Sequence, residues 1–359
     1  MLAAVLTGTG QDKVEVRRDV ETTGFGPGKV RVAIRATGLC HSDLSAISGK
    51  LAHPVPVVLG HEGAGEVLEV GEGVTHVRPG DRVTVNWRPS CGICGLCRRG
   101  QSNLCPSGAA ARHVTGFTAG GTDLYRFVGA GTFAEQIVLD AGFAAPIPQD
   151  ISYEAAALIG CGLTTGFGAA VNTAGVQPGD TVAVLGCGGV GISAILGART
   201  AGAAQIVAVD PVATRRKWAL EFGATEAVAP EELADAAARH TEGLGFDHVI
   251  EAVGRRAAVR SAFEATRPGG NVCLVGVAGP EEMFPASLME LFAGEKRVLP
   301  SVYGGADVTR TYGRIIDLVR AGRLDIESLV THRLPLTEIH EAIDLMHRGE
   351  SLRVMLTTD

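Results

Sequence analysis

The feature that most constrains the fold of this chain is the glycine-rich run Gly186-Cys187-Gly188-Gly189-Val190-Gly191. It directly follows a strand-like apolar run, Val182 to Leu185, and opens a helix-like run of small and apolar residues, Val190 to Ala201. Strand-like and helix-like runs then alternate up to about Val302. Further strands are expected over 205–209, 224–229, 248–252 and 271–275, and a second helix over 212–222. This alternation predicts an α/β fold with a doubly wound parallel sheet covered by helices on both faces.

Between a strand and a helix, the spacing G-x-G-x-x-G is the fingerprint of a dinucleotide-binding loop. Gly186 is expected to make the tight turn, Gly188 to let a pyrophosphate approach the backbone, and Gly191 to let the helix pack on the strand. Gly189 and Val190 complete the loop. The N-terminus of the following helix would offer N–H donors and a positive dipole end to the phosphates.

An acidic residue stands where the second strand ends. Asp210 lies nineteen residues after Gly191, and a carboxylate there accepts hydrogen bonds from ribose hydroxyls and repels a 2′-phosphate. The sequence therefore favours NAD over NADP. Arg215, Arg216 and Lys217 follow, and two of these three are expected on a solvated helix face.

The chain before this region is rich in short strand-like runs separated by Gly, Pro and Asp. The runs lie at 30–36, 67–70, 82–86 and 133–139. They predict a small barrel-like domain with long loops.

The chain after about Thr309 has two helix-like stretches, 309–321 and 337–348, and a last apolar run, 352–356. We expect that run to return to the first domain. The predicted organisation is a discontinuous domain of residues 1–163 and 304–359 and a second domain of residues 164–303.

Four cysteines stand close together in the first domain. They are Cys91, Cys94, Cys97 and Cys105, within a lobe of about residues 88–108. Four thiolates at this spacing suit one tetrahedral structural zinc that is closed to water. A disulfide pair, free thiols or an iron–sulfur cluster are the alternatives for the same residues.

A histidine and a glutamate, His61 and Glu62, stand at a bend between two apolar runs. Such groups are costly to bury without a partner, and a metal ion satisfies an imidazole together with thiolates. Cys40 upstream and Cys161 downstream are candidate partners. The hypothesis is a second zinc held by Cys40, His61 and Cys161 with its fourth position open. Taken alone, each of these residues is more commonly a packed core or surface residue.

Composition excludes several classes of function. The chain has 359 residues, a formal net charge of −7, 46% hydrophobic residues and eight cysteines. A negative net charge argues against nonspecific nucleic-acid binding. No apolar run of 18 residues and no signal peptide are recognisable, so we expect a cytoplasmic protein without a membrane span. In that compartment, cysteines serve metals or catalysis more than disulfides.

These motifs occur in an order that resembles a known family. Cys-His-Ser-Asp from Cys40, Gly-His-Glu-Gly-Ala-Gly-Glu-Val from Gly60, the four-cysteine lobe, Gly-Cys-Gly-Leu-Thr-Thr-Gly from Gly160 and the fingerprint follow one another. The whole chain resembles a zinc-dependent alcohol dehydrogenase of the medium-chain dehydrogenase/reductase superfamily. It is most similar to the branch with class III-type, mycothiol-dependent and nicotinoprotein enzymes, and Trp87 before the lobe adds to that likeness. The resemblance implies a GroES-like catalytic domain and a Rossmann coenzyme domain.

The resemblance also implies roles for individual residues. Cys40, His61 and Cys161 would bind the catalytic zinc, Glu62 would lie behind it, and Asp43 would orient His61. Ser42 would begin a proton relay from the alcohol oxygen. The coenzyme would contact His41, Thr165, Val190, Arg215, Val277 and Arg353. Leu51, Trp87, Phe127 and Val277 would line the substrate pocket, although plain core packing explains the last three nearly as well.

The sequence departs from the family pattern in two places. The histidine that follows the zinc cysteine by five residues in vertebrate-type relays is Ser45 here. Glutathione-dependent relatives carry acids before the Gly-His-Glu and an Arg after the last lobe cysteine. Here the segment after Gly49 has no acid, the Arg position is Ala109, and Arg112 is not aligned. A glutathione adduct is therefore not the expected substrate.

The predicted function is interconversion of a primary alcohol with an apolar or aromatic tail and its aldehyde, with two zinc ions per chain and NAD. The alternatives are oxidation of a thiol adduct of formaldehyde, such as the mycothiol adduct, and a nicotinoprotein that retains its NAD. A non-catalytic binding protein is a further alternative, which the complete ligand set and Ser42 argue against. A homodimer is expected, in which the stretch Arg297 to Tyr303 would pair across a two-fold axis.

Overall fold

The computed structural model describes residues 1–110 and 113–358, with residues 109–110 as backbone only. Contacts within the chain form two compact units. The first comprises Met1–Cys161 and Tyr312–Asp359, and the second comprises Gly162–Thr311.

The second unit is built on a six-stranded sheet in the order β14-β13-β12-β15-β16-β17. The strands are β12 (Thr181–Leu185), β13 (Gln205–Val209), β14 (Glu226–Val228), β15 (Phe246–Glu251), β16 (Thr266–Leu274) and β17 (Arg297–Pro300). Every neighbouring pair is parallel. The predicted parallel α/β sheet is thus confirmed. The strand order reverses at β12, and ligands of such sheets bind at this switch point.

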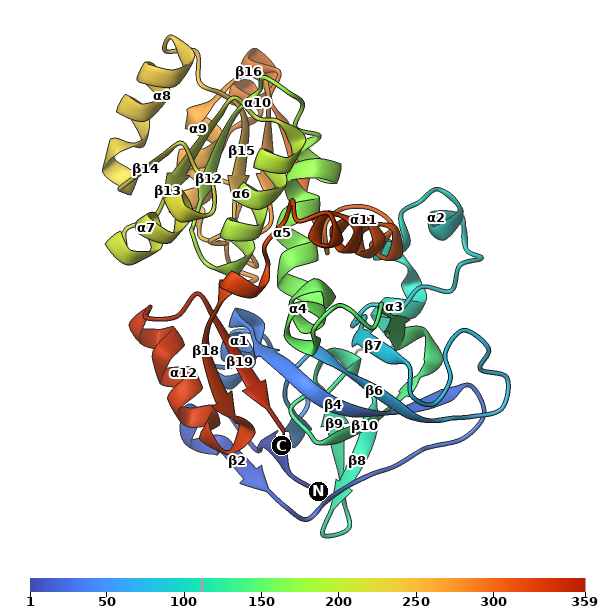
Figure 1. Cartoon of the computed structure of the whole chain (residues 1–359). Helices are drawn as coiled ribbons and strands as arrows, with labels where there is room; N and C mark the ends of the chain where they lie inside the picture. The colour runs from blue at the N-terminus through green and yellow to red at the C-terminus, as the bar shows by residue number, and fades with distance from the viewer. Residues whose placement is uncertain (111–112, 359) are drawn as a thin grey trace. The chain divides into compact units, whose positions relative to one another are not determined.

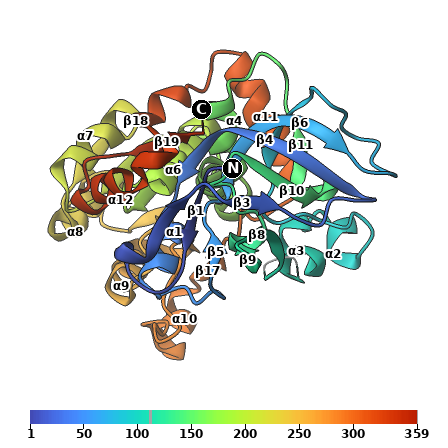
Figure 2. The same ribbon diagram turned by 90° about the horizontal axis from the view of Figure 1, so that it is seen from below.

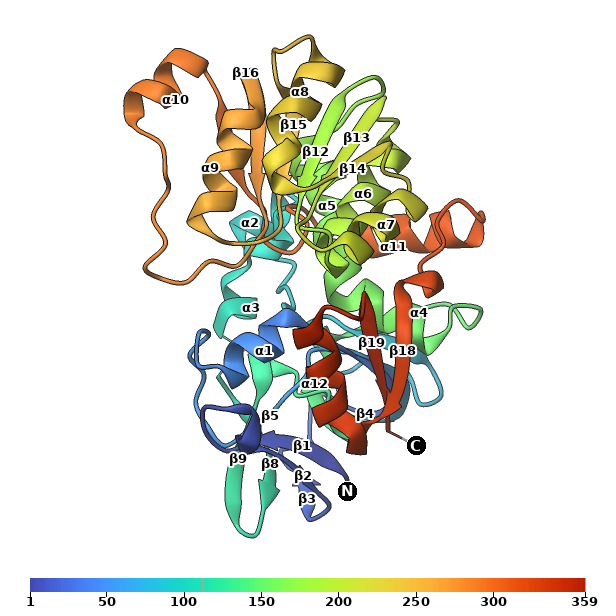
Figure 3. The same ribbon diagram turned by 90° about the vertical axis from the view of Figure 1, so that its left-hand side faces the viewer.

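Helices cover the sheet of the second unit (Figure 1; Figure 3). They are α5 (Thr164–Gly168), α6 (Gly189–Ala201), α7 (Ala213–Glu221), α8 (Leu233–Thr241), α9 (Arg256–Ala265) and α10 (Leu288–Gly294). Helix α6 packs on β12 and β13, and α9 packs on β15 and β16. The core between strands and helices is made of small and branched apolar side chains, with Phe246 and Phe263 as its largest members.

One carboxylate ties neighbouring strands of this sheet together. Asp247 of β15 accepts hydrogen bonds from the backbone N–H and the hydroxyl of Thr181, each at 2.8 Å, and from Arg267 Nε at 2.7 Å. Burial acts to raise the pKa of Asp247, but these donors outweigh it, so the pKa lies below its usual value.

The first unit contains two mainly antiparallel sheets (Figure 2). One has the order β2-β1-β5-β9-β8-β3, from β1 (Ala3–Leu6), β2 (Val14–Arg17), β3 (Val20–Thr22), β5 (Val57–Val58), β8 (Thr115–Ala119) and β9 (Thr122–Arg126). The other has the order β11-β7-β6-β4-β19-β18, with β10 also paired to β4. Its strands are β4 (Lys29–Leu39), β6 (Glu62–Val70), β7 (Arg82–Val85), β10 (Gln136–Asp140), β11 (Ala144–Pro146), β18 (Val330–Pro335) and β19 (Arg353–Thr357).

The C-terminal strand belongs to this first unit, because β19 pairs antiparallel with β4, Val354 opposite Leu39. The helices here are α1 (His41–Ile47), α2 (Gly95–Arg98), α3 (Pro106–Ala110), α4 (Tyr153–Leu158), α11 (Val308–Arg320), which begins just before the unit boundary, and α12 (Ile339–Arg348). A π-helical turn, Ile159–Leu163, continues α4. Figure 3 shows α12 beside β18 and β19, on which it packs.

Among the described residues, one helical stretch, Tyr153–Ala174, is long and apolar enough to cross a membrane by length and composition alone. However, 83% of its most apolar window is buried inside the protein. Its apolar character is therefore accounted for by core packing.

Candidate metal centres and nucleotide-binding loop

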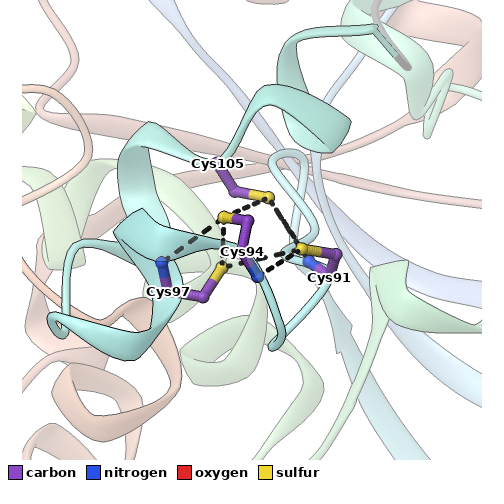
Figure 4. Close-up of side chains that lie close together, drawn as sticks. All are labelled: Cys91, Cys94, Cys97 and Cys105. Atoms are coloured by element: carbon purple, nitrogen blue, oxygen red, sulfur yellow. Dashed lines mark hydrogen bonds between the residues drawn. The ribbon is translucent and has the colours of Figure 1, made fainter.

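The four cysteines of the lobe converge on one point (Figure 4). Their sulfur atoms are 3.5 Å apart for Cys94 and Cys97, 3.6 Å for Cys91 and Cys105, and 4.0 Å for Cys94 and Cys105. A disulfide needs an S–S distance of about 2.05 Å, so these are free thiols. Tetrahedral Zn–S bonds of about 2.3 Å place sulfurs about 3.8 Å apart. The donor set therefore fits one zinc ion, and the separations are too short for thiols arranged around a multi-iron cluster.

Backbone N–H groups of the lobe favour thiolates at Cys91 and Cys105. The N–H groups of Cys91 and Cys94 donate to Cys105 Sγ and Cys91 Sγ, each at 3.4 Å. Burial acts to raise the pKa of Cys105, but N–H donors from Cys91 and Ser107 lower it to about 6. A thiolate is the form that binds a metal.

The second group brings together Cys40, His61, Glu62 and Cys161, with ligand atoms all within 4.8 Å of one another. All four residues are buried. Cys40 lies between β4 and α1, His61 and Glu62 lie at the start of β6, and Cys161 lies in the π-helical turn after α4. The predicted set is thus assembled, and Glu62 is close enough to serve as a fourth ligand.

Asp43 fixes the two loops that carry Cys40 and His61. One carboxylate oxygen accepts the N–H of Cys40 at 3.1 Å and lies 3.5 Å from His61 Nδ1. The other accepts the N–H of Gly60 at 2.9 Å. A carboxylate on the far nitrogen of a ligand imidazole orients the ring for metal binding. The structure thus brings the Asp43 carboxylate beside the His61 ring, and its role in orienting that ring stays a prediction.

Glu62 and Arg353 form a buried ion pair beside this group. Among the described residues, both oxygens of Glu62 and the Nε of Arg353 are buried without a hydrogen-bond partner. Arg353 balances the charge of Glu62, but buried carboxylate oxygens without hydrogen-bond partners are costly, and a divalent cation bound next to Glu62 would satisfy them. Two thiols, an imidazole and an unsatisfied carboxylate fit zinc. The predicted contact of Arg353 with the coenzyme stays a prediction.

The charge state of the group is set by its own members. A hydrogen bond from Cys161 holds the pKa of Cys40 well below its usual range, and the same interaction raises the pKa of Cys161. Burial acts to lower the pKa of His61, but the charge of Asp43 and the contact with Cys40 raise it to about 10. One thiolate is thus already favoured before a metal binds.

Aromatic side chains border His61. The ring of Phe127 lies 5.6 Å from the imidazole, and that of Trp87 lies 6.4 Å from it, both edge-on. Phe127 is fully buried, Trp87 and Leu51 are partly buried, and Val277 of the second unit is 65% exposed. The structure brings the first three to one core cluster.

Two other predicted residues stand beside the first zinc ligand. Ser42 lies in the first turn of α1, with its Oγ 3.7 Å from Cys40 Sγ, and His41 is exposed. In the second unit, Thr165 lies next to Gly166, which packs so tightly on the Val190 carbonyl that a Cβ there would collide. The turn of α5 that carries Thr165 and Gly166 therefore packs on the start of α6.

The fingerprint loop turns as the sequence predicted for this spacing. Gly186 has φ +90, which favours glycine, and a Cβ on Gly191 would collide with the Gly186 carbonyl. A Cβ on Gly188 would meet open space, so this backbone is accessible to a ligand. Helix α6 begins at Gly189.

Asp210 uses its carboxylate to hold the loop. It accepts the N–H of Cys187 at 2.8 Å and that of Val212 at 2.9 Å. Arg215 Nη1 lies 4.0 Å away, and Arg216 donates to the Asp210 carbonyl at 2.7 Å. The backbone bonds to Asp210 were not foreseen from its sequence position.

Two features near the metal group were missed by the sequence reasoning. Gly60 has φ +87 and donates to Asp43, and Tyr312 of α11 donates to the Gly160 carbonyl. The Gly-His-Glu triplet itself was the available signal for Gly60, whereas Tyr312 has none. The side chain of Ala109 and the whole of Arg112, used above to argue against glutathione, lie outside the described residues.

The sequence matches two family descriptions. Residues 26–149 match the family described as Alcohol dehydrogenase GroES-like domain, and residues 189–320 match that described as Zinc-binding dehydrogenase. These spans contain the four-cysteine lobe and the start of α6.

The chain is also similar to named proteins over nearly its whole length. It is 38% identical to the S-(hydroxymethyl)glutathione dehydrogenase of Escherichia coli over 343 residues, 92% of each chain. Its structure is similar to benzyl alcohol dehydrogenase from Acinetobacter calcoaceticus, with TM-score 0.92, 27% identity, and 100% and 99% of the two chains covered. It is also similar to alcohol dehydrogenase TADH from Thermus sp. ATN1, with TM-score 0.85, 32% identity and 99% of each chain covered.

Proposed function

The chain belongs to the zinc-dependent alcohol dehydrogenases of the medium-chain dehydrogenase/reductase superfamily, and we propose that its substrate is a primary alcohol with an apolar or aromatic tail. It is an oxidoreductase with a structural four-cysteine zinc site, a catalytic Cys/His/Glu/Cys site and a nicotinamide coenzyme. The observation that carries the proposal is the aromatic border of His61. Phe127 and Trp87 stand edge-on to this ligand, so a substrate oxygen at the metal group has apolar surface beside it.

The residues around the catalytic metal site have separate roles in the reaction. A zinc ion bound there supplies a Lewis acid that lowers the pKa of an alcohol. Asp43 keeps His61 oriented through Nδ1. Ser42, next to Cys40, takes the hydroxyl proton and passes it outward. In vertebrate-type relays a histidine stands at the position of Ser45. Because this chain lacks that histidine, the relay is shorter, and solvent receives the proton closer to the metal site than it does in those relatives.

Coenzyme choice is the second part of the proposal, and Asp210 supports it. Its carboxylate is buried at the end of β13, where it would accept hydrogen bonds from the ribose hydroxyls of NAD and repel the 2′-phosphate of NADP. The guanidinium of Arg215 stands close enough to receive adenosine phosphate or ribose oxygens. NAD is therefore the proposed hydride acceptor.

A second candidate substrate is the thiol adduct of formaldehyde. The name of the Escherichia coli relative, 38% identical, favours it. Lack of an acid between Gly49 and Gly60 argues against glutathione as the thiol, which leaves a different thiol such as mycothiol. A nicotinoprotein with permanently bound NAD is a variant of either proposal.

The test is a steady-state comparison of benzyl alcohol, ethanol and formaldehyde with glutathione or mycothiol, each with NAD or NADP. A phenyl group buries about 100 Å² more apolar surface than a methyl group, about 2.5 kcal/mol at 25 cal/mol per Å². We expect kcat/KM for benzyl alcohol to exceed that for ethanol by about 70-fold. If the protein oxidises formaldehyde only in the presence of a thiol and has no activity on free alcohols, the thiol adduct of formaldehyde is the substrate and the present proposal is wrong. NAD that stays with the protein through gel filtration would identify the nicotinoprotein.

We also propose that the protein is a homodimer. Strand β17 is the edge of its sheet, and the preceding α10 exposes Leu288, Met289 and Phe292. Edge strands and exposed apolar helices are commonly covered in assemblies. Light scattering at micromolar concentration should give twice the 37.1 kDa chain mass. A monomer mass would refute the proposal.

A further inference from the structure

A buried tyrosine lies behind one of the catalytic zinc ligands. Tyr312 is in α11, in the C-terminal segment of the first unit, and is 4% exposed. Its hydroxyl donates to the backbone carbonyl of Gly160 at 3.2 Å. Gly160 is bonded directly to Cys161, so this hydrogen bond acts one peptide from the ligand sulfur.

The segment that carries Cys161 is an irregular helix. It passes from α4 into the π-helical turn Ile159–Leu163. A change from α to π register shifts the N–H to C=O pairing by one residue, and such turns are frequent at functional sites. Side-chain donors from outside the helix reach two carbonyls of this segment. Thr84 donates to the Ala156 carbonyl at 2.8 Å, and Tyr312 donates to that of Gly160.

The same segment has no freedom to move toward the sheet. A Cβ on Gly160 would lie 2.7 Å from Thr84 Oγ1 and 3.0 Å from the Val85 carbonyl oxygen. Gly160 is thus pressed on β7 from one side, and the Tyr312 hydroxyl holds its carbonyl. The two contacts together fix the peptide from which the Cys161 side chain departs.

We propose that Tyr312 is a positioning residue for the zinc ligand Cys161. Its hydroxyl holds the π-helical turn so that the sulfur stays at bonding distance from the ion shared with Cys40 and His61. The ligand distances of zinc sites fall within about 0.2 Å of their standard values, so release of the Gly160 carbonyl would weaken zinc binding selectively at this site. The proposal rests on the family's catalytic zinc site and not on the proposed substrate.

The experiment compares zinc release from Tyr312→Phe and from the unmodified holoprotein. Phenylalanine keeps the buried ring and removes only the hydroxyl. Zinc is withdrawn by a colorimetric chelator without substrate or coenzyme, and the zinc of the four-cysteine lobe in the same molecule is the internal standard. We expect catalytic zinc to leave about tenfold faster, as when outer partners of metal ligands are removed. The zinc of the lobe should leave at its usual rate.

The matched control is Tyr153→Phe. It makes the same chemical change at the first residue of α4, where the tyrosine ring lies under Arg82, and should release both ions as the unmodified protein does. With Co²⁺ at the catalytic site, Tyr312→Phe should also shift the thiolate-to-metal absorption band. Unchanged release and spectrum would overturn the proposal, as would faster release of both ions in equal measure. A lower melting temperature with unchanged release would also overturn it, by assigning Tyr312 to folding alone.

Discussion

The substitution Gly60→Ala tests how the backbone around His61 is built. Gly60 has φ +87. A Cβ there would lie 2.6 Å from Thr132 Oγ1 and 2.7 Å from the Phe133 backbone nitrogen, and would also meet the Phe133 ring. Gly60 itself donates to Asp43 and accepts the N–H of Thr132, each at 2.9 Å. Alanine therefore either distorts these two bonds or displaces the loop that carries His61.

The stability that Gly60→Ala is expected to lose has two parts, and a control variant separates them. A left-handed backbone costs a non-glycine residue about 1–2 kcal/mol, and overpacking costs about 1–3 kcal/mol more. Gly80 is in the same unit with φ +88 and has open space where its Cβ would be. Gly80→Ala therefore carries the first cost alone. We expect Gly60→Ala to be less stable than Gly80→Ala by about 1–3 kcal/mol.

The assays are urea unfolding and zinc content of both variants. Gly80→Ala should keep two zinc ions per chain, whereas Gly60→Ala should lose the catalytic ion because His61 is displaced. Equal stabilities of the two variants would refute the steric argument. Two zinc ions retained by Gly60→Ala would refute the link between this backbone and His61.

Four further outcomes are expected. Cys97→Ala should leave one zinc per chain by metal analysis and lower the free energy of unfolding by more than about 3 kcal/mol; two zinc ions would contradict the lobe assignment. The unmodified protein should prefer NAD over NADP by at least about tenfold in kcat/KM, about 1.4 kcal/mol, and Asp210→Gly should erode that preference; equal use of both coenzymes by the unmodified protein would disprove it. Ser42→Ala should lower turnover by about 100-fold or more with near-normal NAD affinity in fluorescence titration, and unchanged turnover would exclude the relay. Asp247→Asn should lower stability by about 1.5 kcal/mol at pH 7. The pKa of Asp247 in the folded protein lies below its unfolded value of about 3.9. The carboxylate therefore contributes to stability in full above about pH 3.9, and this contribution is lost as the pH falls through the folded pKa. A difference in stability between the Asn variant and the unmodified protein that persists at pH 2 would contradict this.

Sequence reasoning succeeded where chemistry depends on residues close together in the chain. Cys91, Cys94, Cys97 and Cys105 span one lobe, and their spacing alone brought four donors within reach of one ion. The glycine loop after β12 is equally local, because its turn, its helix start and its strand are consecutive. The parallel sheet followed from alternation, since crossover helices leave no other pairing for strands of this length.

The catalytic group was predicted in its membership and with Asp43 beside it, but the supporting residues that are distant in the sequence were not predicted, and the reason is sequence separation. Cys40, His61 and Cys161 were identified from short motifs, each of which is local. Arg353 reaches Glu62 only because β19 pairs with β4, and no residue near Arg353 specifies that pairing. Tyr312 is separated from Gly160 by 152 positions, and the need for its hydroxyl arises from a π-helical turn that propensities do not distinguish from an α-helix. Side chains that chelate a metal therefore leave a pattern in the sequence, whereas side chains that hold the chelating backbone become visible only when the fold is built.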